Sequence, residues 1–237
     1  MKNAKNLFGY DSLAFFGRVN ASISHELKNI MAIISETAGL LSDLSEMAST
    51  GTPVDPGLLK NSTDSIMEEI QRGFETIRQM NRFSHSVDKP VISTDLIELL
   101  NLVCHLCNYL SFSGMLRVTQ WVGDPPVVQT CPFQLQAIVY EIIVQHFKNA
   151  GPDGQLEVTV QPLHDSGCRI VFSNVFLKDV QVFPDDHLRN AAASIAVIIE
   201  CDRDENQLEL YVPSAIQLVA ENDVAIQAIP ADGRPSF

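Results

Sequence analysis

The sequence contains no apolar run long enough to cross a membrane. A helix that spans a bilayer needs about 20 predominantly apolar residues, and the chain of 237 residues has no such stretch. Residues 1–6 are not followed by the apolar core of a secretory signal peptide. We therefore expect a cytoplasmic protein without a membrane partner.

Basic residues are also scarce. The chain has 16 Lys and Arg against 29 Asp and Glu, which gives a formal net charge of −13. Proteins that bind nucleic acid neutralise its phosphates with clustered Lys and Arg, so this charge argues against a nucleic-acid partner. It suits a globular protein whose partners are other proteins.

Paired metal ligands are missing as well. The five cysteines are an odd number, which fits free thiols in a reducing compartment. Cys104 and Cys107 have the spacing of half a zinc site, but no second ligand pair follows at zinc-site spacing. Residues 96–110 have helical periodicity, so we interpret the two thiols as part of a buried helix face and predict no metal site.

Two long helices are predicted over residues 10–49 and 58–86. Residues 49–57 contain two prolines and two glycines and form the turn between them. Both helices carry apolar or small residues at alternating steps of four and three, the pattern of a helix packed against other helices. One hairpin cannot bury apolar stripes on both helices and their flanks. We therefore expect two copies to form a homodimeric four-helix bundle.

The rest of the chain mixes helices and strands. Helices are predicted over residues 93–109, 132–148 and 185–199, the first capped by Ser93 or Thr94. Strands are predicted over residues 116–122, 126–130, 156–163, 169–173 and 207–212. The predicted fold is α+β: the helical hairpin of residues 1–88, a two-layer α/β sandwich over residues 89–222, and a flexible tail over residues 223–237.

The segment from Ser24 to Asn29 carries the chemistry. His25 is two residues from both Ile23 and Leu27, so its side chain points away from the packed stripe. Asn29, four residues on, shares the histidine's face, and Glu26 and Lys28 flank it. A solvent-facing histidine offers a neutral ring nitrogen as a nucleophile near neutral pH.

This segment resembles the H-box of bacterial two-component histidine kinases, and the order of elements resembles their transmitter core over residues 12–213. The resemblance implies that His25 is the phosphoacceptor and that Glu26 orients or deprotonates the imidazole. It also implies that Asn29 positions a water molecule or the phosphoryl group. The family usually has a proline where this chain has Ile30, so the helix bend that such a proline produces is expected to be weaker.

The second domain resembles the family's ATP-binding domain, but its nucleotide chemistry is missing. Glu141 and Gln145 stand where the family uses asparagines to hold Mg²⁺ and the phosphates. The longer Gln145 side chain would misplace a magnesium ligand. No glycine occurs from Val175 to Ile199, where a phosphate-binding lid would need several. The chain therefore looks closest in kind to the dimeric histidine phosphotransferases, with a degenerate ATPase-like domain.

From this resemblance we predict phosphoryl transfer between His25 and receiver-domain aspartates. No cofactor is expected, because the receiver would supply the Mg²⁺. The expected partners are response-regulator receiver domains, with a hybrid histidine kinase as a further candidate. Two alternatives stay open: a kinase without its own sensor but with an unorthodox ATP site, and a non-catalytic dimeric adaptor that binds a receiver or kinase. The predicted docking residues are Ala21, Ser22, Lys28, Phe74 and Arg78.

Overall fold

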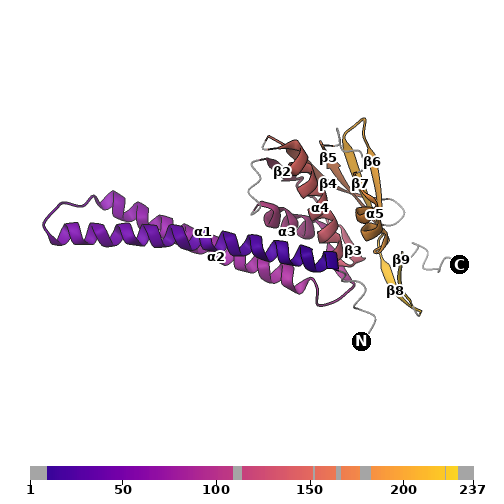
Figure 1. Ribbon diagram of the computed structural model, residues 1–237, viewed down its shortest axis with the longest axis horizontal. Coiled ribbons are helices and arrows are strands. Elements are labelled where there is room, and N and C mark those ends of the chain that lie inside the picture. Colours follow the sequence, from indigo (N-terminus) through magenta and orange to yellow (C-terminus); the bar gives the residue numbers. More distant parts are fainter. Residues whose placement is uncertain are drawn as a thin grey trace. The chain divides into compact units, whose positions relative to one another are not determined.

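The computed structural model describes residues 10–108, 114–151, 153–163, 167–176, 183–221 and 223–228. The chain divides into two compact units. One consists of Gly17–Arg82, and the other combines Met1–Phe16 with Phe83–Phe237. Figure 1 shows the elements of both units.

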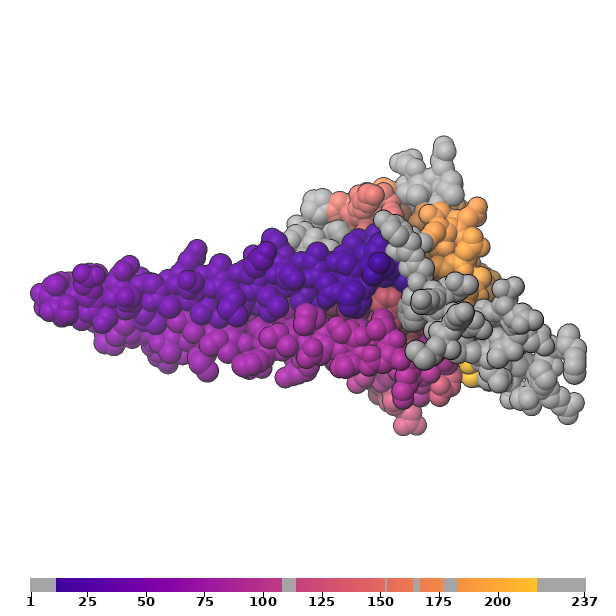
Figure 2. Space-filling view, turned by 60° about the horizontal axis from the view of Figure 1, so that its bottom comes forward, coloured from indigo at the N-terminus to yellow at the C-terminus, as the bar shows by residue number. Residues whose placement is uncertain are grey.

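The unit Gly17–Arg82 is a helical hairpin. It is built from the helices α1 (Tyr10–Ser49) and α2 (Pro56–His85), which run side by side in Figures 1 and 2. Ile23 and Ile30 of α1 are fully buried, as the alternating apolar pattern predicts. Gly73 of α2 faces Ile30, and a Cβ added to it would lie 3.6 Å from Ile30 Cγ2. The space between the helices here would therefore accept an added methyl group in ordinary van der Waals contact.

The turn between the helices follows from local chemistry. Gly51 has a φ of +87°, which favours glycine, and its N–H donates to the Ala48 carbonyl at the end of α1. Asp55 caps α2, since its Oδ1 accepts a 2.8 Å hydrogen bond from the N–H of Gly57. Pro56 is the first residue of α2, where its missing N–H costs nothing. The predicted hairpin is confirmed within two residues at each helix end.

An aromatic cluster lies in the second unit. Phe15, in the first turns of α1, contacts Phe83, Phe133 and Tyr140 with ring centroids 5.0–5.4 Å apart. Phe83 and Phe133 are also in contact, at 5.9 Å, and all four rings are buried. Such clusters bury large areas and add edge-to-face contacts. This packing explains why the first residues of α1 and the last residues of α2 belong to this unit.

The core of the second unit is a five-stranded mixed sheet in the order β2-β4-β5-β7-β6. Its strands are β2 (Met115–Val118), β4 (Gln155–Pro162), β5 (Cys168–Ser173), β6 (Ile198–Asp202) and β7 (Gln207–Val212). β2 runs parallel to β4, and the other pairs are antiparallel. Two smaller sheets pair β1 (Ile92–Asp95) with β3 (Val127–Thr130), and β8 (Ile216–Glu221) with β9 (Asp223–Ala228).

One face of the main sheet is packed and the other is more exposed. Leu156 and Val158 of β4 are buried, whereas Glu157 between them is exposed. The helices of this unit are α3 (Leu96–Asn108), α4 (Pro132–Ala150) and α5 (Asp186–Ala193). The buried side of α4 carries Leu135, Ile138 and Ile142. The predicted α+β class is confirmed, and the dimeric four-helix bundle stays a prediction.

The helix predicted over residues 93–109 is wrong at its start. Ser93 and Thr94 belong to strand β1, where they pair with Gln129 and Val128 of β3. Neither caps the helix. Asp95 does, because its Oδ1 accepts hydrogen bonds from the N–H groups of Ile97 (2.8 Å) and Glu98 (3.2 Å).

Three further boundaries differ from the prediction. The strand predicted to reach residue 122 ends at Val118. The helix predicted over residues 185–199 ends at Ala193, and its last residues enter β6 instead. Residues 223–228, predicted as the start of a flexible tail, form β9. Residues 229–237 lie outside the described part of the chain, and the division at residues 88 and 222 stays a prediction. None of the helices in the described ranges is both long and apolar enough to cross a membrane.

Candidate functional site

His25 lies on the exposed side of α1. Asn29, one turn further along, places its amide nitrogen Nδ2 3.4 Å from the imidazole Nδ1. The helix period makes this pairing possible, because residues four apart share a face. The amide nitrogen donates and Nδ1 accepts, so the proton of the neutral ring is on Nε2, the ring nitrogen that Asn29 does not contact.

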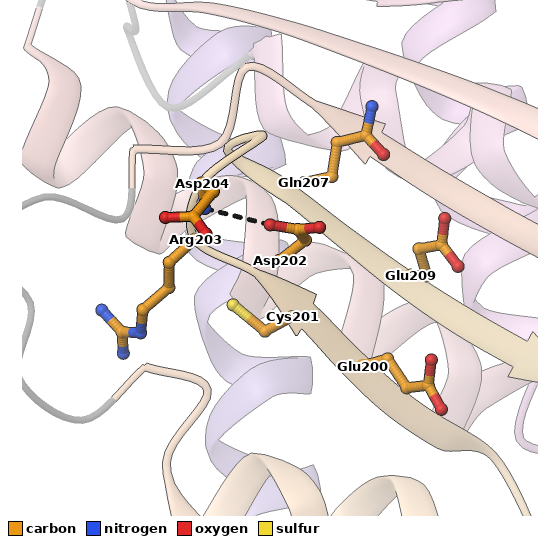
Figure 3. A pocket seen from close by; sticks show the side chains of 7 residues that line it. All are labelled: Glu200, Cys201, Asp202, Arg203, Asp204, Gln207 and Glu209. Carbon is orange, nitrogen blue, oxygen red and sulfur yellow. Dashed lines mark hydrogen bonds between the residues drawn. The ribbon is translucent and has the colours of Figure 1, made fainter.

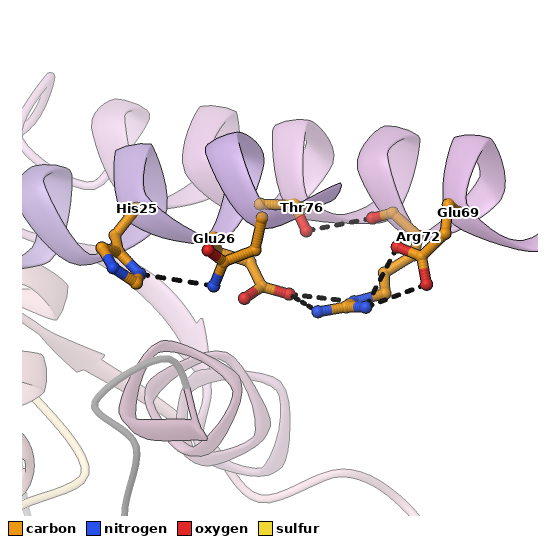
Figure 4. Close-up of polar contacts among 6 residues, drawn as sticks. His25, Glu26, Glu69, Arg72 and Thr76 are labelled. Carbon is orange, nitrogen blue, oxygen red and sulfur yellow. Dashed lines mark hydrogen bonds and ion pairs between the residues drawn. The ribbon is translucent and has the colours of Figure 1, made fainter. Parts of the chain in front are cut away.

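Glu26 faces α2 instead. Both Nε (2.9 Å) and Nη2 of Arg72 donate to its Oε1 (Figure 4). The Nη1 of Arg72 donates to both carboxylate oxygens of Glu69, at 3.0 and 3.1 Å. Hydrogen bonding to Glu26 raises the pKa of Arg72, and burial partly opposes this shift. One guanidinium therefore joins two carboxylates, one from each helix.

This arrangement differs from the expected role of Glu26. The sequence favours a hydrogen bond between Glu26 and the imidazole of His25, but in the structure the ring contact comes from Asn29. Adjacent helix residues point about 100° apart, so Glu26 reaches α2 while His25 faces outward. The assignment of His25, Glu26 and Asn29 as catalytic residues stays a prediction.

The predicted docking residues fall into two groups. Ala21 and Lys28 are exposed, and they lie four residues before and three after His25, so they share its face. Ser22, which is half-buried, lies one turn before Glu26. Phe74 and Arg78 lie one turn apart on α2 and share a face with each other.

That α2 face is not the one that meets Glu26. Phe74 is two residues from Arg72, so the two side chains point to nearly opposite sides of α2. Arg78 forms an ion pair with Glu75 of its own helix. The structure thus brings Ala21 and Lys28 together with His25, and places Phe74 and Arg78 on another side of α2.

The residues that replace the family's asparagines bind each other. Nε2 of Gln145 donates to Oε1 of Glu141 at 2.9 Å, one turn apart on α4. Each is half-buried. A magnesium ion would need their oxygens turned toward it at about 2.1 Å in octahedral geometry. The observed pairing instead satisfies one side chain with the other, so these residues do not fit the Mg²⁺–ATP role.

His146, the next residue on α4, is buried. Its Nδ1 accepts a 3.1 Å hydrogen bond from the N–H of Phe176, which follows β5. The proton must then be on Nε2, which is buried without a hydrogen-bond partner among the described residues. Burial lowers the pKa of His146 to about 4. The ring is therefore neutral near pH 7 and connects α4 to the end of the sheet.

Gly167 allows close packing within the sheet and is not part of a phosphate-binding loop. It has a φ of +106°, and a Cβ at this position would lie 2.1 Å from the Val212 carbonyl oxygen of β7. Its missing side chain allows close backbone approach at the start of β5. The glycine nearest to the expected lid therefore has a structural explanation.

A hollow at β6 and β7 is lined by Glu200, Cys201, Asp202, Arg203, Asp204, Gln207 and Glu209. Asp202 Oδ1 accepts hydrogen bonds from the N–H groups of Asp204 (Figure 3) and Glu205 and so stabilises the turn between the strands. Arg203 donates to the Phe183 carbonyl. Four acidic residues line this surface, and they would repel a nucleotide's phosphates.

The described residues contain no group of three or more His, Cys, Asp or Glu that could hold a metal ion. Cys104 and Cys107 lie on α3, the first half-buried and the second buried. Burial raises the pKa of Cys104 to about 12, so this thiol stays protonated.

Arg72 is the functional candidate that the sequence did not reveal. The contact joins residues 46 positions apart, and its formation depends on the register of the two helices. The run from Ser24 to Asn29 identifies Glu26 but not its partner. In the structure, Gly73 of the neighbouring α2 position lies beside Ile30, which shows which turn of α2 meets this part of α1.

No protein-family model matches the chain, and no curated protein sequence matches it. Solved structures do. The catalytic domain of histidine kinase ThkA has 11% identity and a TM-score of 0.43, covering 54% of this chain and 99% of its own. The ATP-binding domain of PrrB from Mycobacterium tuberculosis has 14% identity and a TM-score of 0.41, covering 53% of this chain and 98% of its own.

A structure described as a bacterial phosphotransferase has 10% identity and a TM-score of 0.45. That match covers 84% of this chain and 95% of the phosphotransferase chain. The solved structures similar to the chain therefore include histidine kinase catalytic domains and a phosphotransferase.

Proposed function

We propose that this protein is a histidine phosphotransferase of a two-component phosphorelay. Nε2 of His25 attacks the phosphorus of a receiver domain's aspartyl phosphate. The N–P bond forms as the acyl O–P bond breaks, and the electron pair of that bond stays on the aspartate carboxylate. Before the attack the ring proton moves from Nε2 to Nδ1 through solvent, and the Asn29 amide turns so that its Oδ1 accepts the Nδ1–H hydrogen bond; that proton then stays on the ring. The reverse step delivers the phosphoryl group to a second receiver.

The observation that carries this proposal is the contrast between the two candidate sites. His25 is exposed on a helix, and Asn29 lies against its Nδ1, so Nε2 is the ring nitrogen that a phosphoryl donor would approach. At the positions that would hold Mg²⁺ and ATP, Glu141 and Gln145 are bonded to each other. A phosphoacceptor without fitting ATP ligands needs an external phosphoryl donor.

In this proposal the receiver domain stabilises the negative charge of the phosphoryl group during transfer. A phosphoryl group in transit carries negative charge that must be stabilised. We assign this stabilisation to the receiver's Mg²⁺ and its acidic residues, and no step to a metal held by this chain. The face that Ala21 and Lys28 share with His25 is the proposed docking surface, since a small residue there permits close approach.

The test is a labelling experiment in two arms. A receiver domain carrying a radiolabelled aspartyl phosphate should pass label to the chain, and the label should be acid-labile and absent from His25→Ala. Radiolabelled ATP alone should leave the chain unlabelled. Label from ATP would favour the kinase alternative, and a receiver that keeps its phosphoryl group would leave the adaptor alternative.

The homodimer belongs to the same proposal. Met67, Ile70, Phe74 and Ile77 of α2 follow one another at steps of three and four, and all are exposed in a single copy. Met31 of α1 is also exposed, at 59%. Exposed stripes of this kind mark interaction surfaces. A second copy that covers the α2 stripe would complete a four-helix bundle, which gives Phe74 a place in the dimer and not beside the receiver.

A further inference from the structure

Arg72 connects the phosphoacceptor turn of α1 to α2. Its Nε and Nη2 both bind Oε1 of Glu26, while its Nη1 binds Glu69 (Figure 4). A guanidinium is a rigid planar fork, and two of its donors converge on one oxygen, so Oε1 of Glu26 is held in a fixed position beside α2. Glu26 is therefore held toward α2, and its neighbour His25 keeps the Asn29 contact.

The burial of Glu26 makes this ion pair necessary. The Glu26 side chain is only 13% exposed, whereas that of Arg72 is 45% exposed. A carboxylate in this position is poorly hydrated and needs a counter-ion or strong donors. Without Arg72 it would turn toward solvent, and solvent is also where His25 points.

We propose that Arg72 is a positioning residue for phosphoryl transfer. It holds Glu26 against α2 and compensates its charge, so that an anionic phosphoryl donor meets His25 without an unpaired carboxylate beside it. The inference rests on the proposed function, because it assumes that a phosphoryl group approaches His25. It assigns Glu26 to charge and position instead of proton transfer.

Loss of Arg72 would make the charge beside His25 more negative. With Arg72 in place, Glu26, Glu69 and Arg72 together carry one net negative charge; without it they carry two. The phosphoryl donor is itself an anion, so the added charge opposes its approach. The effect should appear mainly in the donor concentration needed for transfer, and it should weaken as salt screens the charges.

The experiment compares four variants with the wild type. Arg72→Gln removes the compensating charge, and Arg72→Lys keeps the charge but loses the fork. Glu26→Gln/Arg72→Gln removes both members of the pair. Lys60→Gln is the matched control, because it makes the same charge change on an exposed residue of α2 about 18 Å along the helix axis. Circular dichroism melts verify that each variant is folded.

Two donors are used with each protein: a receiver domain carrying aspartyl phosphate, and phosphoramidate, a small phosphoryl donor that releases ammonia. For Arg72→Gln we expect the concentration at half-maximal rate to rise about tenfold, with a smaller change in the maximal rate. Arg72→Lys should lie between this variant and the wild type. Glu26→Gln/Arg72→Gln should recover to within about threefold of the wild type, and Lys60→Gln should stay within about twofold. Between about 0.05 and 1 M salt the difference for Arg72→Gln should largely vanish.

Either of two results would overturn the proposal. Arg72→Gln could behave like Lys60→Gln, or the double variant could be as slow as Arg72→Gln at every salt concentration. Failure of the proposed function gives a different result, since no protein would then take label from the receiver. In that event the rates of phosphorylation by phosphoramidate can still be compared among the variants, and they test the role of Arg72 separately.

Discussion

The contact between Gly73 and Ile30 yields a quantitative prediction about the hairpin. Gly73 is in the interior of α2, where alanine is more favourable than glycine by about 1 kcal/mol. A Cβ at this position would lie 3.6 Å from Ile30 Cγ2, an ordinary van der Waals distance. The new methyl group would also be buried, which adds up to about 0.8 kcal/mol. Gly73→Ala should therefore raise the free energy of unfolding of the hairpin by about 1–2 kcal/mol.

Two other glycines provide the controls. Gly39 is an exposed residue of α1 with nothing within 4 Å of an added Cβ, so Gly39→Ala should gain only the helix propensity, about 1 kcal/mol. Gly114, in the other unit, has no room: its Cβ would lie 2.3 Å from Phe147 Cε1 and 2.6 Å from the Gly154 carbonyl oxygen. Gly114→Ala should destabilise that unit by about 1–3 kcal/mol.

The assay is urea denaturation monitored by circular dichroism, with all proteins at one concentration because a dimer's apparent stability depends on it. The order of stability should be Gly73→Ala, then Gly39→Ala, then the wild type, then Gly114→Ala. If Gly73→Ala is less stable than the wild type, the helices approach more closely at Ile30 than the structure has them. The reasoning about the hairpin register, and with it the Arg72–Glu26 contact, would then be refuted.

Three further predictions concern the core, the buried histidine and the dimer. Phe83→Ala should lower the unfolding free energy of the α+β unit by about 3–5 kcal/mol in urea titrations, because it removes a buried ring of the aromatic cluster; a loss below about 1 kcal/mol would contradict this packing. The pKa of His146 is lowered from 6.5 to about 4, so its neutral form stabilises the fold fully above pH 6.5, and this contribution is lost as the pH falls toward 4. His146→Gln should show a shallower loss of stability between pH 6.5 and 4, and an unchanged slope would count against the buried neutral ring. Phe74→Glu should convert the proposed dimer to a monomer in light scattering at matched concentration, whereas a variant that stays dimeric would move the interface to another face.

The sequence was informative where structure depends on local periodicity. The alternating steps of four and three in α1 placed Ile23 and Ile30 in the packed seam, and the same period placed His25 outside it. The turn was also predictable, because Gly51, Asp55 and Pro56 have strong positional preferences. These features depend on neighbours within about one helical turn.

The errors occur where a distant segment decides the outcome. Ser93 and Thr94 are good caps, but pairing with β3 draws them into β1, and Asp95 caps the helix instead. The residues after Ala193 could continue a helix locally, yet Ile198 and Ile199 pair with β7. Intrinsic preference is a weak prior against such tertiary pairing.

The candidate site shows the same difference between contacts within one helical turn and contacts between distant segments. His25 and Asn29 are one turn apart, so their contact could be predicted from the sequence. Arg72 is 46 residues from Glu26, and no local pattern indicates that contact. The docking role of Phe74 stays a prediction; the helix period places Phe74 almost opposite Arg72.

The central claim is that His25 receives its phosphoryl group from a receiver domain and not from ATP. The most direct measurement follows radiolabel on the chain when it is mixed either with a receiver domain carrying labelled aspartyl phosphate or with labelled ATP and Mg²⁺. We predict acid-labile label from the receiver alone, retained in Lys60→Gln and absent from His25→Ala. Label on His25 from ATP, or a receiver that keeps its phosphoryl group in the presence of the wild-type protein, would contradict it.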